Sequence, residues 1–428
     1  MSIKKSHFIL YGCKVNQYET NGMREKFIEK GYEIVDFNEI ADIYIVNTCA
    51  VTNIADKKSR QILRRAKIHN KNAIVVAMGC YAQVAQKEIE KIQEVDLIIG
   101  NVGKKDIVEY VERFISKKQK NNIKNIEDEK NFADFGIVSH SEKTRMEIKI
   151  QDGCNQFCSY CIIPYARGRI RSRSKESILQ EVQKNQEKGI REIVITGIHI
   201  ASYGKDLGNI TLIDLLEEID KKTNINRIRL GSLEPSIIDE DFVNRLKKLN
   251  KICNQFHLSL QSGCDDVLKR MNRKYNTKEF EKCVDLLRNN IKDVLLTTDV
   301  IVGFPGETDE EFEKTYEYLE KIKFYKMHVF KYSKKSGTVA AKMPNQIRDE
   351  IKEIRSKRLI ELSDENEKNY LKSYIGKDVE VLFEEREGNF YKGHTTNYML
   401  VKKESNKDLN NQIITVTPKE LKGLELIC

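Results

Sequence analysis

The sequence lacks the long apolar segments of membrane proteins. No stretch of its 428 residues approaches the ~18 consecutive apolar residues that a membrane-spanning helix needs. A secretory signal is also missing, because the N-terminal MSIKKSHFILYGC soon turns polar and has no small-residue cleavage site. We therefore expect a cytoplasmic protein that does not bind membranes.

A strong excess of one charge is also lacking. The chain has 74 Lys and Arg against 65 Asp and Glu, which gives a net charge of +9. This surplus favours a polyanionic partner only weakly, because a general richness in Lys, Asn and Ile would produce it equally well. At ~150 residues per domain, the length predicts two to four domains.

Disulfides are not expected either, although the chain has ten cysteines. Without a secretory signal, such a number argues for metal or redox chemistry instead. The cysteines are Cys13, Cys49, Cys80, Cys154, Cys158, Cys161, Cys253, Cys264, Cys283 and Cys428. The last four show no paired spacing, so we expect them to be packing residues.

The first quarter of the chain alternates short apolar runs with amphipathic stretches. The runs predict strands over 7–12, 42–48, 73–79 and 95–100, separated by helices over 18–30, 54–69, 81–92 and 104–118. Strands that alternate with helices are typical of βαβ units, so residues 1–118 are predicted to form an open parallel α/β sheet domain. The polar stretch that follows has no apolar periodicity and predicts an exposed linker over 119–140.

Six further strand–helix pairs predict a second α/β domain over 141–366. Its strands are expected from 146 and over 192–198, 227–233, 256–263, 295–304 and 326–333, and its helices over 176–188, 211–222, 239–249, 277–290 and 308–323. Six pairs within ~190 residues indicate a partial (β/α)6 barrel, since a complete eightfold barrel usually needs ~250 residues.

A charged helix over 347–370 leads out of this domain, and the last segment changes character. Residues 367–428 show alternating apolar residues, which predicts a small OB-like β-barrel of a kind whose faces often bind nucleic acid. Its ten basic residues are balanced by ten acidic ones, so a strong electrostatic RNA footprint is not visible there.

The segment QDGCNQFCSYC carries the most specific motif. It places Cys154, Cys158 and Cys161 with C-x3-C-x2-C spacing directly after a predicted strand. Three thiolates in one loop can hold one face of an iron–sulfur cluster and leave a fourth iron open to another ligand. Structural zinc would need a fourth Cys or His, which Cys253, Cys264 or a histidine would have to supply in space. Zinc and unligated thiols therefore stay open as alternatives.

Cys13, Cys49 and Cys80 form a second set, although they lie far apart in the chain. Each follows an apolar run, in FILYGC, IYIVNTC and AIVVAMGC. Loops at the carboxyl ends of parallel strands converge on one crevice, so these three thiols can meet there. Their spacing alone does not distinguish such a site from ordinary buried cysteines.

The two cysteine sets together resemble a known family. The C-x3-C-x2-C motif with Tyr160 before its last cysteine resembles that of the radical S-adenosylmethionine (SAM) enzymes. GCKVNQ (12–17), NTCAV (47–51) and MGCYA (78–82) resemble the N-terminal domain of the methylthiotransferases, and the likeness extends over nearly the whole chain. It implies a radical SAM core and a C-terminal RNA-binding barrel of the TRAM type.

The resemblance also implies the cofactors. One 4Fe–4S cluster, at Cys154, Cys158 and Cys161, would generate the radical. An auxiliary 4Fe–4S cluster, held by the N-terminal set, would carry the sulfur to be inserted. SAM would serve as radical source and as methyl donor. The electron donor and the sulfur source are not identified by the sequence, and we expect a monomer.

The string GCKVNQYETNGM (12–23) resembles the MtaB-type branch of the family. This branch implies methylthiolation of the adenine C2 of N6-threonylcarbamoyladenosine at position 37, in the anticodon loop of tRNA. Branches that modify isopentenyladenosine in tRNA or an aspartate of a ribosomal protein remain alternatives. A zinc-containing RNA-binding protein without enzymatic activity is a further alternative.

Other residues are candidates because of their places in the predicted barrel. Carboxyl strand ends in such barrels face the active site. Gly197, Gln261 and Ser262 end predicted strands, Asp299 lies within the fifth strand, Arg273 follows the fourth, and Tyr160 lies in the cysteine motif. We expect these six residues to contact SAM, with turn chemistry or core packing as the alternative. His199, His257 and His328 are expected to be hydrogen-bonded core residues.

Two basic runs are candidates for RNA binding. ARGRIRSRSK (166–175) contains Arg167, Arg169, Arg171 and Arg173 but no acidic residue, which predicts phosphate contacts along one face beside the first cysteine set. The alternative is a solvated basic loop. A second run, Lys57 to Lys71 on the helix after Cys49, is equally compatible with an RNA-binding face and a solvated one.

Overall fold

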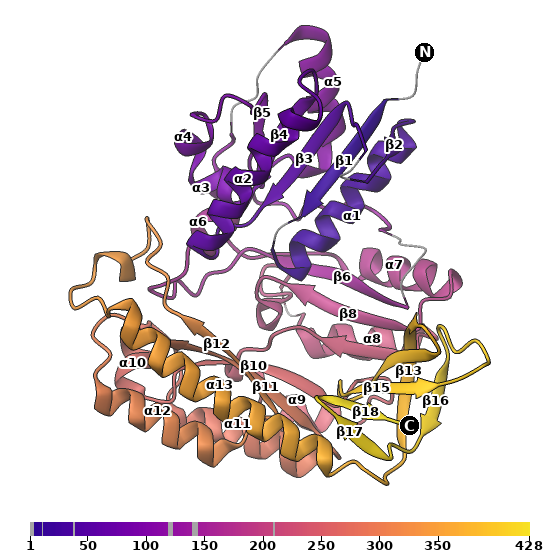
Figure 1. The fold of residues 1–428 in the computed structure, drawn as a ribbon, viewed down its shortest axis with the longest axis vertical. Coiled ribbons are helices and arrows are strands. Elements are labelled where there is room, and N and C mark those ends of the chain that lie inside the picture. The colour runs from indigo at the N-terminus through magenta and orange to yellow at the C-terminus, as the bar shows by residue number, and fades with distance from the viewer. Residues whose placement is uncertain (1–3, 11, 37–38, 119–122, 139–143, 209) are drawn as a thin grey trace.

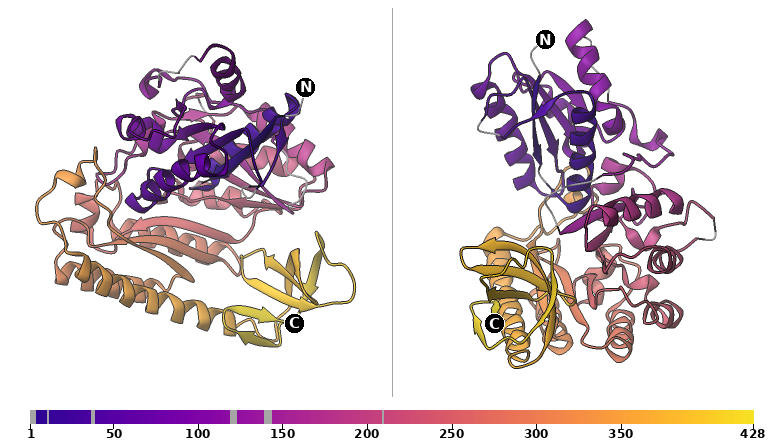
Figure 2. Two further views of the ribbon diagram at one scale, coloured as in Figure 1. Left: turned by 45° about the horizontal axis from the view of Figure 1, so that its top comes forward. Right: turned by 90° about the vertical axis from the view of Figure 1, so that its right-hand side faces the viewer.

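The computed structural model describes residues 4–428 except 11, 37–38, 119–122, 139–143 and 209. Three units follow one another along the chain, shown in Figure 1 from indigo through magenta and orange to yellow. The N-terminal unit lies against one side of the central unit, and the C-terminal sheet lies beside its far end (Figures 1 and 2). None of the described helices is long and apolar enough to cross a membrane.

The N-terminal unit is a five-stranded parallel sheet. Its strands run in the order β2-β1-β3-β4-β5. They are β1 (Lys5–Leu10), β2 (Glu33–Ile34), β3 (Ile43–Thr48), β4 (Ile74–Gly79) and β5 (Leu97–Ile99). Its helices are α1 (Lys14–Glu29), α2 (Asn53–His69), α3 (Cys80–Val84), α4 (Gln86–Ile89) and α5 (Ile107–Lys117), with the 3-10 turn η1 (Lys104–Asp106). The parallel sheet predicted from βαβ alternation is present.

Helix α1 joins this unit to the central one. Tyr18 and Phe27 bury apolar surface, while Asn16, Glu19 and Thr20 are buried polar residues on the same helix. A helix covered on more than one side has no single apolar stripe. This explains why the sequence pattern placed its start at residue 18, four residues beyond Lys14, where the helix begins.

The central unit is a partial barrel of six parallel strands with helices outside. They are β6 (Arg145–Asp152), β8 (Glu192–Gly197), β9 (Arg227–Leu230), β10 (Gln255–Gln261), β11 (Leu295–Val302) and β12 (Lys326–Lys331). The β6-β8-β9 and β10-β11-β12 groups are linked by the parallel bridges Ile228 to Ile252 and Leu233 to Leu258. A short strand β7 (Arg171–Ser172) pairs antiparallel with the outer edge of β6.

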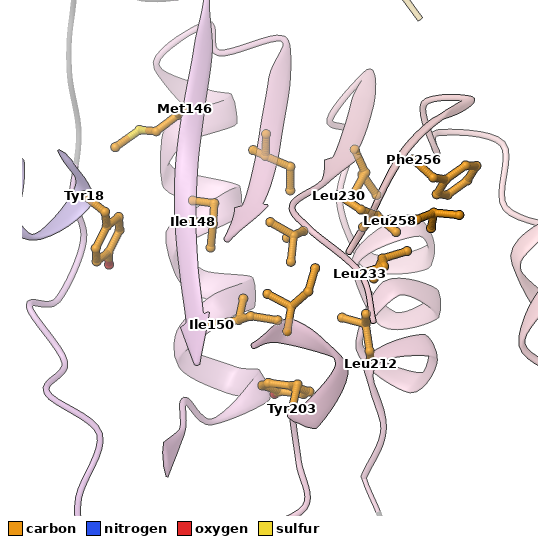
Figure 3. Close-up of a cluster of buried hydrophobic side chains, with 14 of the residues drawn as sticks. Tyr18, Met146, Ile148, Ile150, Tyr203, Leu212, Leu230, Leu233, Phe256 and Leu258 are labelled. Carbon is orange, nitrogen blue, oxygen red and sulfur yellow. The ribbon is translucent and has the colours of Figure 1, made fainter. Parts of the chain in front are cut away.

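Helices cover the outside of this barrel. They are α7 (Lys175–Glu187), α8 (Leu212–Lys222), α9 (Glu240–Leu246), α10 (Asp265–Arg270), α11 (Thr277–Asn290) and α12 (Asp309–Ile322), whereas the short α6 (Ile163–Arg167) lies against α3 of the N-terminal unit (Figure 1). Leucine and isoleucine side chains from the strands fill the interior. In Figure 3, Ile148 and Ile150 of β6 face this core, while Tyr18 of α1 lies on the opposite side of the strand.

The segment predicted as an exposed linker is only partly exposed. Residues 119–122 and 139–140 of it lie outside the described residues. Of the rest, Ile126, Phe135 and Val138 are buried in the structure. Phe135 packs so closely on α1 that a Cβ at Gly22 would lie 2.8 Å from it. Three isolated apolar residues without periodicity gave no pattern that sequence analysis could detect.

The C-terminal unit is a six-stranded mixed sheet at the end of a long helix. Helix α13 (Asp349–Lys372) continues through the predicted boundary at residue 367. The strands are β13 (Val379–Glu387), β14 (Phe390–Thr395), β15 (Leu400–Glu404), β16 (Ile413–Val416), β17 (Glu420–Lys422) and β18 (Glu425–Ile427), in the order β16-β13-β14-β15-β18-β17. Pairs are antiparallel except β15 with β18.

Candidate functional site

The loop after β6 carries Cys154, Cys158 and Cys161. Gly153 turns the chain out of the strand with φ +71°, and a Cβ there would lie 1.8 Å from the Arg169 carbonyl oxygen. Only glycine fits such an approach at this dihedral angle. The Cys154 amide donates to Gly168 O at 3.0 Å, which closes the loop onto the residue after α6.

Neighbouring segments anchor the rest of this loop. The Ser159 amide and hydroxyl donate to Met271 O and Arg270 O, at 3.0 and 2.8 Å. Asn272 Nδ2 donates to Phe157 O at 2.9 Å, where Phe157 has a φ of +50°. The loop is therefore held from the segment after α10, a helix that the sequence pattern did not reveal because it spans only six residues.

The three thiols of the loop share one buried region. Burial, together with charge on Cys158, raises the pKa of Cys161 to about 12 and that of Cys154 to about 11. Arg273 Nη1 donates to Cys158 Sγ at 3.2 Å, and the Gln156 amide donates to Cys154 Sγ at 3.4 Å. Buried thiols that repel one another as thiolates fit a cationic metal group, which deprotonates its cysteine ligands.

The second set lies at the carboxyl ends of β1, β3 and β4. A Cβ at Gly12 would lie 3.1 Å from Cys49 Cβ and 3.3 Å from Cys49 Sγ, so the Cys13 and Cys49 loops are in contact. Burial, together with charges on Cys80 and Cys13, raises the pKa of Cys49 to about 11. The three cysteines that are 31 or more residues apart in sequence thus meet at one sheet edge. Their donor set also fits an iron–sulfur cluster.

Neither cysteine set has the geometry of a single-ion site. In tetrahedral zinc sites with ~2.3 Å Zn–S bonds, the sulfur atoms lie about 4 Å apart. Among the described residues, only Cys264, Asp266 and Glu311 place three ligand atoms within 4.8 Å of one another. Glu311 there is already bound by Arg270, at 2.6 and 2.8 Å. Neither cysteine set brings its three sulfur atoms within 4.8 Å of one another in the described part of the chain.

A cavity of about 260 Å³ is lined by residues of both the N-terminal and the central unit. Val51 and Thr52 line it from the loop after Cys49, and Cys161 lines it from the loop after β6. Tyr160, Gln261 and Asp299, three of the predicted SAM contacts, also line it. Most of the remaining wall is apolar, formed by Ile162, Ile163, Ile301, Phe330 and Tyr332. The N-terminal and central units therefore enclose one common space.

The other predicted SAM contacts have different surroundings. Arg273 contacts the Cys158 sulfur and stacks over Tyr275 at 4.8 Å. Gly197 ends β8, where a Cβ would lie 3.0 Å from Gln151 O. Ser262 is fully buried, and its hydroxyl pairs with the Cys264 amide and Thr315 Oγ1, both at 3.2 Å. The Ser262 side chain therefore fits the turn-chemistry alternative and does not line the cavity.

Glu234 is a residue that sequence analysis missed. It follows β9 and is 4% exposed, yet it contacts three groups of the site. Oε2 accepts from Gln156 Nε2 at 2.7 Å and lies 2.9 Å from His199 Nε2, while Oε1 lies 3.4 Å from Arg273 Nη2. Arg273 and His199 hold the pKa of Glu234 below its usual value despite burial. Its position before Pro235 at a strand end was the available signal.

His199 and His257 are hydrogen-bonded, as expected, whereas His328 is exposed and does not fit the expected core position. Besides Glu234, His199 contacts Ser202 Oγ through Nδ1 at 2.7 Å. His257 Nε2 lies 3.1 Å from Asp299 Oδ2, and its ring packs against His328 at 5.6 Å between centroids. Partial desolvation lowers the pKa of His328.

The predicted arginine face requires correction. Arg167, Arg171 and Arg173 are at most 4% exposed, so these three cannot contact phosphates along one accessible face. Arg173 forms an ion pair with Glu181, and Arg167 with Glu19 and Asp152. Arg169 alone of the four is exposed, and its guanidinium lies 4.5 Å over the Phe157 ring. Because the acidic partners come from distant segments, the sequence of the basic run gave no sign that three of its arginines are buried in ion pairs.

Helix α2 presents an accessible basic face instead. Lys57, Lys58, Arg64 and Arg65 are exposed, and the helix starts beside the cavity at Thr52, whose hydroxyl caps it. Val51 and Phe330, which line the cavity, are also exposed, as is Ile54 in the first turn of α2. Cationic and apolar side chains thus lie together where a ligand would enter.

Comparison with known families divides the chain as its units do. Residues 148–319 match the Radical SAM superfamily, and residues 5–100 match the family described as "Uncharacterized protein family UPF0004". Two curated relatives are named threonylcarbamoyladenosine tRNA methylthiotransferase MtaB. The Bacillus subtilis protein is 40% identical over 96% of this chain and 92% of its own, and the Aquifex aeolicus protein 38% identical over 96% and 99%.

Other matches are more distant. A protein of Thermoanaerobacter sp. named tRNA-2-methylthio-N(6)-dimethylallyladenosine synthase is 36% identical over 88% of this chain and 82% of its own. Among solved structures, the radical SAM methyltransferase TsrM of Kitasatospora setae superposes with a TM-score of 0.57 at 15% identity, covering 76% of this chain and 73% of that one. This likeness supports the fold alone.

Proposed function

The chain belongs to the radical SAM tRNA methylthiotransferases, and on this premise we propose that it converts N6-threonylcarbamoyladenosine at position 37 of tRNA into its 2-methylthio derivative. The observation that carries the proposal is the cavity lined by residues beside both cysteine sets. The identity of about 40% to MtaB-type relatives over nearly the full chain supports this substrate.

We assign one 4Fe–4S cluster to Cys154, Cys158 and Cys161 and an auxiliary one to Cys13, Cys49 and Cys80. Three thiolates in each set leave one iron free for an exogenous ligand. With SAM, these groups supply a carbon radical, a sulfur atom and a methyl group, chemistry that an unactivated adenine C–H bond requires because it offers no acidic proton.

The chain's own residues position the reactants. Gln261, which ends β10, and Asp299, within β11, are polar groups in a largely apolar part of the cavity wall, so we assign them to orienting SAM. His257 fixes the Asp299 carboxylate from 3.1 Å. Arg273 and Glu234 hold the Cys158 side of the loop through the contacts described above. Because Val51 and Thr52, next to Cys49, share one cavity wall with Cys161, sulfur carried by the N-terminal set would be held near the activated carbon.

We assign tRNA binding to the surface around the cavity mouth. The exposed cations of α2 and Arg169 suit the phosphate backbone. Phe330 and Tyr165, 49% and 44% exposed, suit stacking with unpaired bases of the anticodon loop. The C-terminal sheet is proposed to act as the TRAM-type RNA-binding barrel, and residues 1–118, 141–366 and 367–428 as the three domains.

Nucleoside mass spectrometry of bulk tRNA tests this proposal. A strain that lacks the gene is expected to lose the 2-methylthio mark from threonylcarbamoyladenosine and to regain it when the gene is restored. A change confined to the isopentenyladenosine mark would retain the reaction but refute the substrate. Unchanged levels of every methylthio nucleoside would refute the reaction.

A further inference from the structure

A buried ionic group lies where α1 meets the central unit. It consists of six charged side chains from five elements, each at most 5% exposed: Glu19, Lys104, Lys149, Asp152, Arg167 and Arg171. Two of them, Arg167 and Arg171, belong to the basic run that the sequence had assigned to RNA. Glu19 and Lys104 come from the N-terminal unit, and the other four come from the central unit.

Short contacts connect the members. Glu19 accepts from Lys104 Nζ and Lys149 Nζ, both at 2.6 Å, and from Arg167 Nη1 at 2.8 Å. Asp152 accepts from Lys149 Nζ at 2.6 Å and Arg167 Nη1 at 3.1 Å, with Arg171 Nη2 at 3.9 Å. These contacts form one connected network.

The charges of this group do not balance. It contains four cations and two carboxylates, and the nearby cations, Arg167 foremost, hold the pKa of both carboxyls below the usual range against the effect of burial. Within the described part of the chain, the ion pairs of these cations involve no third carboxylate. A net charge of about +2 therefore stays buried, although buried charges are normally compensated.

The excess charge lies next to the auxiliary cysteine set. Burial lowers the pKa of Lys104, but Glu19 and charge on Cys80 oppose this shift; Asp152 and charge on Cys80 raise the pKa of Arg167. Asn101 Nδ2 connects the two regions, since it lies 3.4 Å from Cys80 Sγ and donates to Ala166 O at 2.7 Å. Arg167 Nε has no hydrogen-bond partner in the structure. An anionic group at Cys80 would compensate these cations.

We propose that the buried ionic group sets the reduction potential of the cluster at Cys13, Cys49 and Cys80 by leaving two positive charges uncompensated beside it. The inference rests on the proposed function, because it requires that auxiliary cluster. Uptake of one electron makes the cluster one unit more negative, and nearby positive charge stabilises this reduced form. The network thereby acts on the cluster through charge, in addition to joining two units.

The test uses the full chain with Cys154, Cys158 and Cys161 each changed to Ala, so that only the auxiliary cluster contributes. The reconstituted protein is titrated with dithionite, and the reduced cluster is measured by electron paramagnetic resonance. Lys104→Met removes a cation and is expected to lower the ratio of reduced to oxidised cluster about tenfold at a fixed potential, or about 59 mV for one electron.

Glu19→Gln removes an anion at the centre of the same network and is expected to shift the potential in the opposite direction. Lys104→Arg keeps the charge and is expected to leave the potential unchanged. If Glu19→Gln does not fold, Asp152→Asn removes the same charge from the second carboxylate. Opposite shifts for the two charge changes support the proposal, because disruption of packing alone would not reverse sign with the charge.

Two results would overturn it. The first is equal potentials in all variants, or shifts of one sign for both charge changes. This result would mean that the ionic group has only a structural role, but it would not refute the auxiliary cluster. The second is absence of any iron–sulfur cluster in the parent with the three Ala substitutions, which would refute the auxiliary cluster and this inference together. Iron and sulfide analysis of the parent distinguishes the two failures.

Discussion

Glycine directly precedes three of the six cysteines in the two sets, Cys13, Cys80 and Cys154, for a reason of backbone geometry. Gly12, Gly79 and Gly153 have φ angles of +130°, +98° and +71°. A positive φ turns the chain sharply at the end of a strand, and glycine adopts it without steric cost. Strand-end glycine–cysteine pairs were visible in the sequence, so the location of the cysteines was predictable. That charges on Cys80 and Cys13 raise the pKa of Cys49 was not predictable, because these residues are distant in sequence.

Of these three glycines, Gly153 leaves the least space for an added Cβ, so its substitution is a direct test. Gly153→Ala is expected to abolish the radical-type cluster, because its methyl group would fall 1.8 Å from Arg169 O. Iron per chain should fall by about four atoms. Gly136→Ala is the matched control, since Gly136 also has a positive φ, +79°, but nothing within 4 Å of an added Cβ. Equal iron in both variants would contradict this account of the loop.

The two cysteine sets are expected to differ in the step that they support. Cys158→Ala should abolish formation of 5′-deoxyadenosine from SAM, because it removes a ligand of the radical-generating cluster. Cys80→Ala should retain uncoupled SAM cleavage but lose thiolation of tRNA.

Quantification of 5′-deoxyadenosine and methylthio nucleosides in one reaction compares them. Cys283→Ala serves as control, because Cys283 is buried beside Pro235 and Ile238, in neither set. SAM cleavage by Cys158→Ala, or thiolation by Cys80→Ala, would refute the respective assignment.

Whole elements were predictable where their periodicity was long. The helix expected over 54–69 is Asn53–His69, and that expected over 277–290 is Thr277–Asn290. Shorter elements such as α6, β7 and α10 gave too few residues for a period to appear. The basic run of residues 166–175 was misread because Arg167 and Glu19 are separated by 148 positions. Sequence proximity reveals which charges are near in the chain, whereas burial depends on partners across units.

The exposed cations of helix α2 are expected to contact the phosphates of tRNA. Changing Lys57, Lys58 and Arg64 to Gln is expected to weaken tRNA binding and to reduce the slope of log affinity against log salt by up to about three, since each phosphate contact contributes about 0.9. A matched triple Gln control is provided by Lys278, Lys282 and Lys314. These lysines are also exposed but belong to α11 and α12, which lie at the bottom of Figure 1, away from α2.

Filter binding at several salt concentrations measures both triple variants. An equal loss of affinity in the two would mean that net charge alone matters. No loss in the α2 variant would remove this helix from the RNA interface.

At the scale of the whole molecule, buried arginines hold the C-terminal sheet on the barrel. Arg229 donates to Thr395 O and Thr396 O, at 3.2 and 3.0 Å, and pairs with Glu192 at 2.7 Å. Tyr398 lies under the guanidiniums of Arg145 and Arg229, at 5.2 and 4.6 Å. The family resemblance predicted this order of units, and the comparisons confirm the family. The contacts between units could not be predicted from the sequence, because each combines residues from distant segments.

Removing the contacts of Arg229 with the C-terminal sheet should lower the free energy of unfolding without removing iron. Arg229→Met leaves Glu192 buried and incompletely paired, and is expected to cost about 3–5 kcal/mol. The exposed Arg386→Gln is the control and should change stability by less than about 0.5 kcal/mol. Thermal unfolding followed by circular dichroism measures both, with iron analysis alongside. Equal melting temperatures would mean that Arg229 does not fasten the sheet.

The central claim is that two cysteine sets, brought together from two units, each hold an iron–sulfur cluster. Iron, sulfide and zinc per chain after anaerobic reconstitution test it most directly, in the unaltered protein and in the two variants with one complete set changed to Ala. The account predicts about eight iron atoms in the unaltered chain, about four in each variant, and no zinc. Zinc in place of iron, or full iron content after loss of either set, would contradict it.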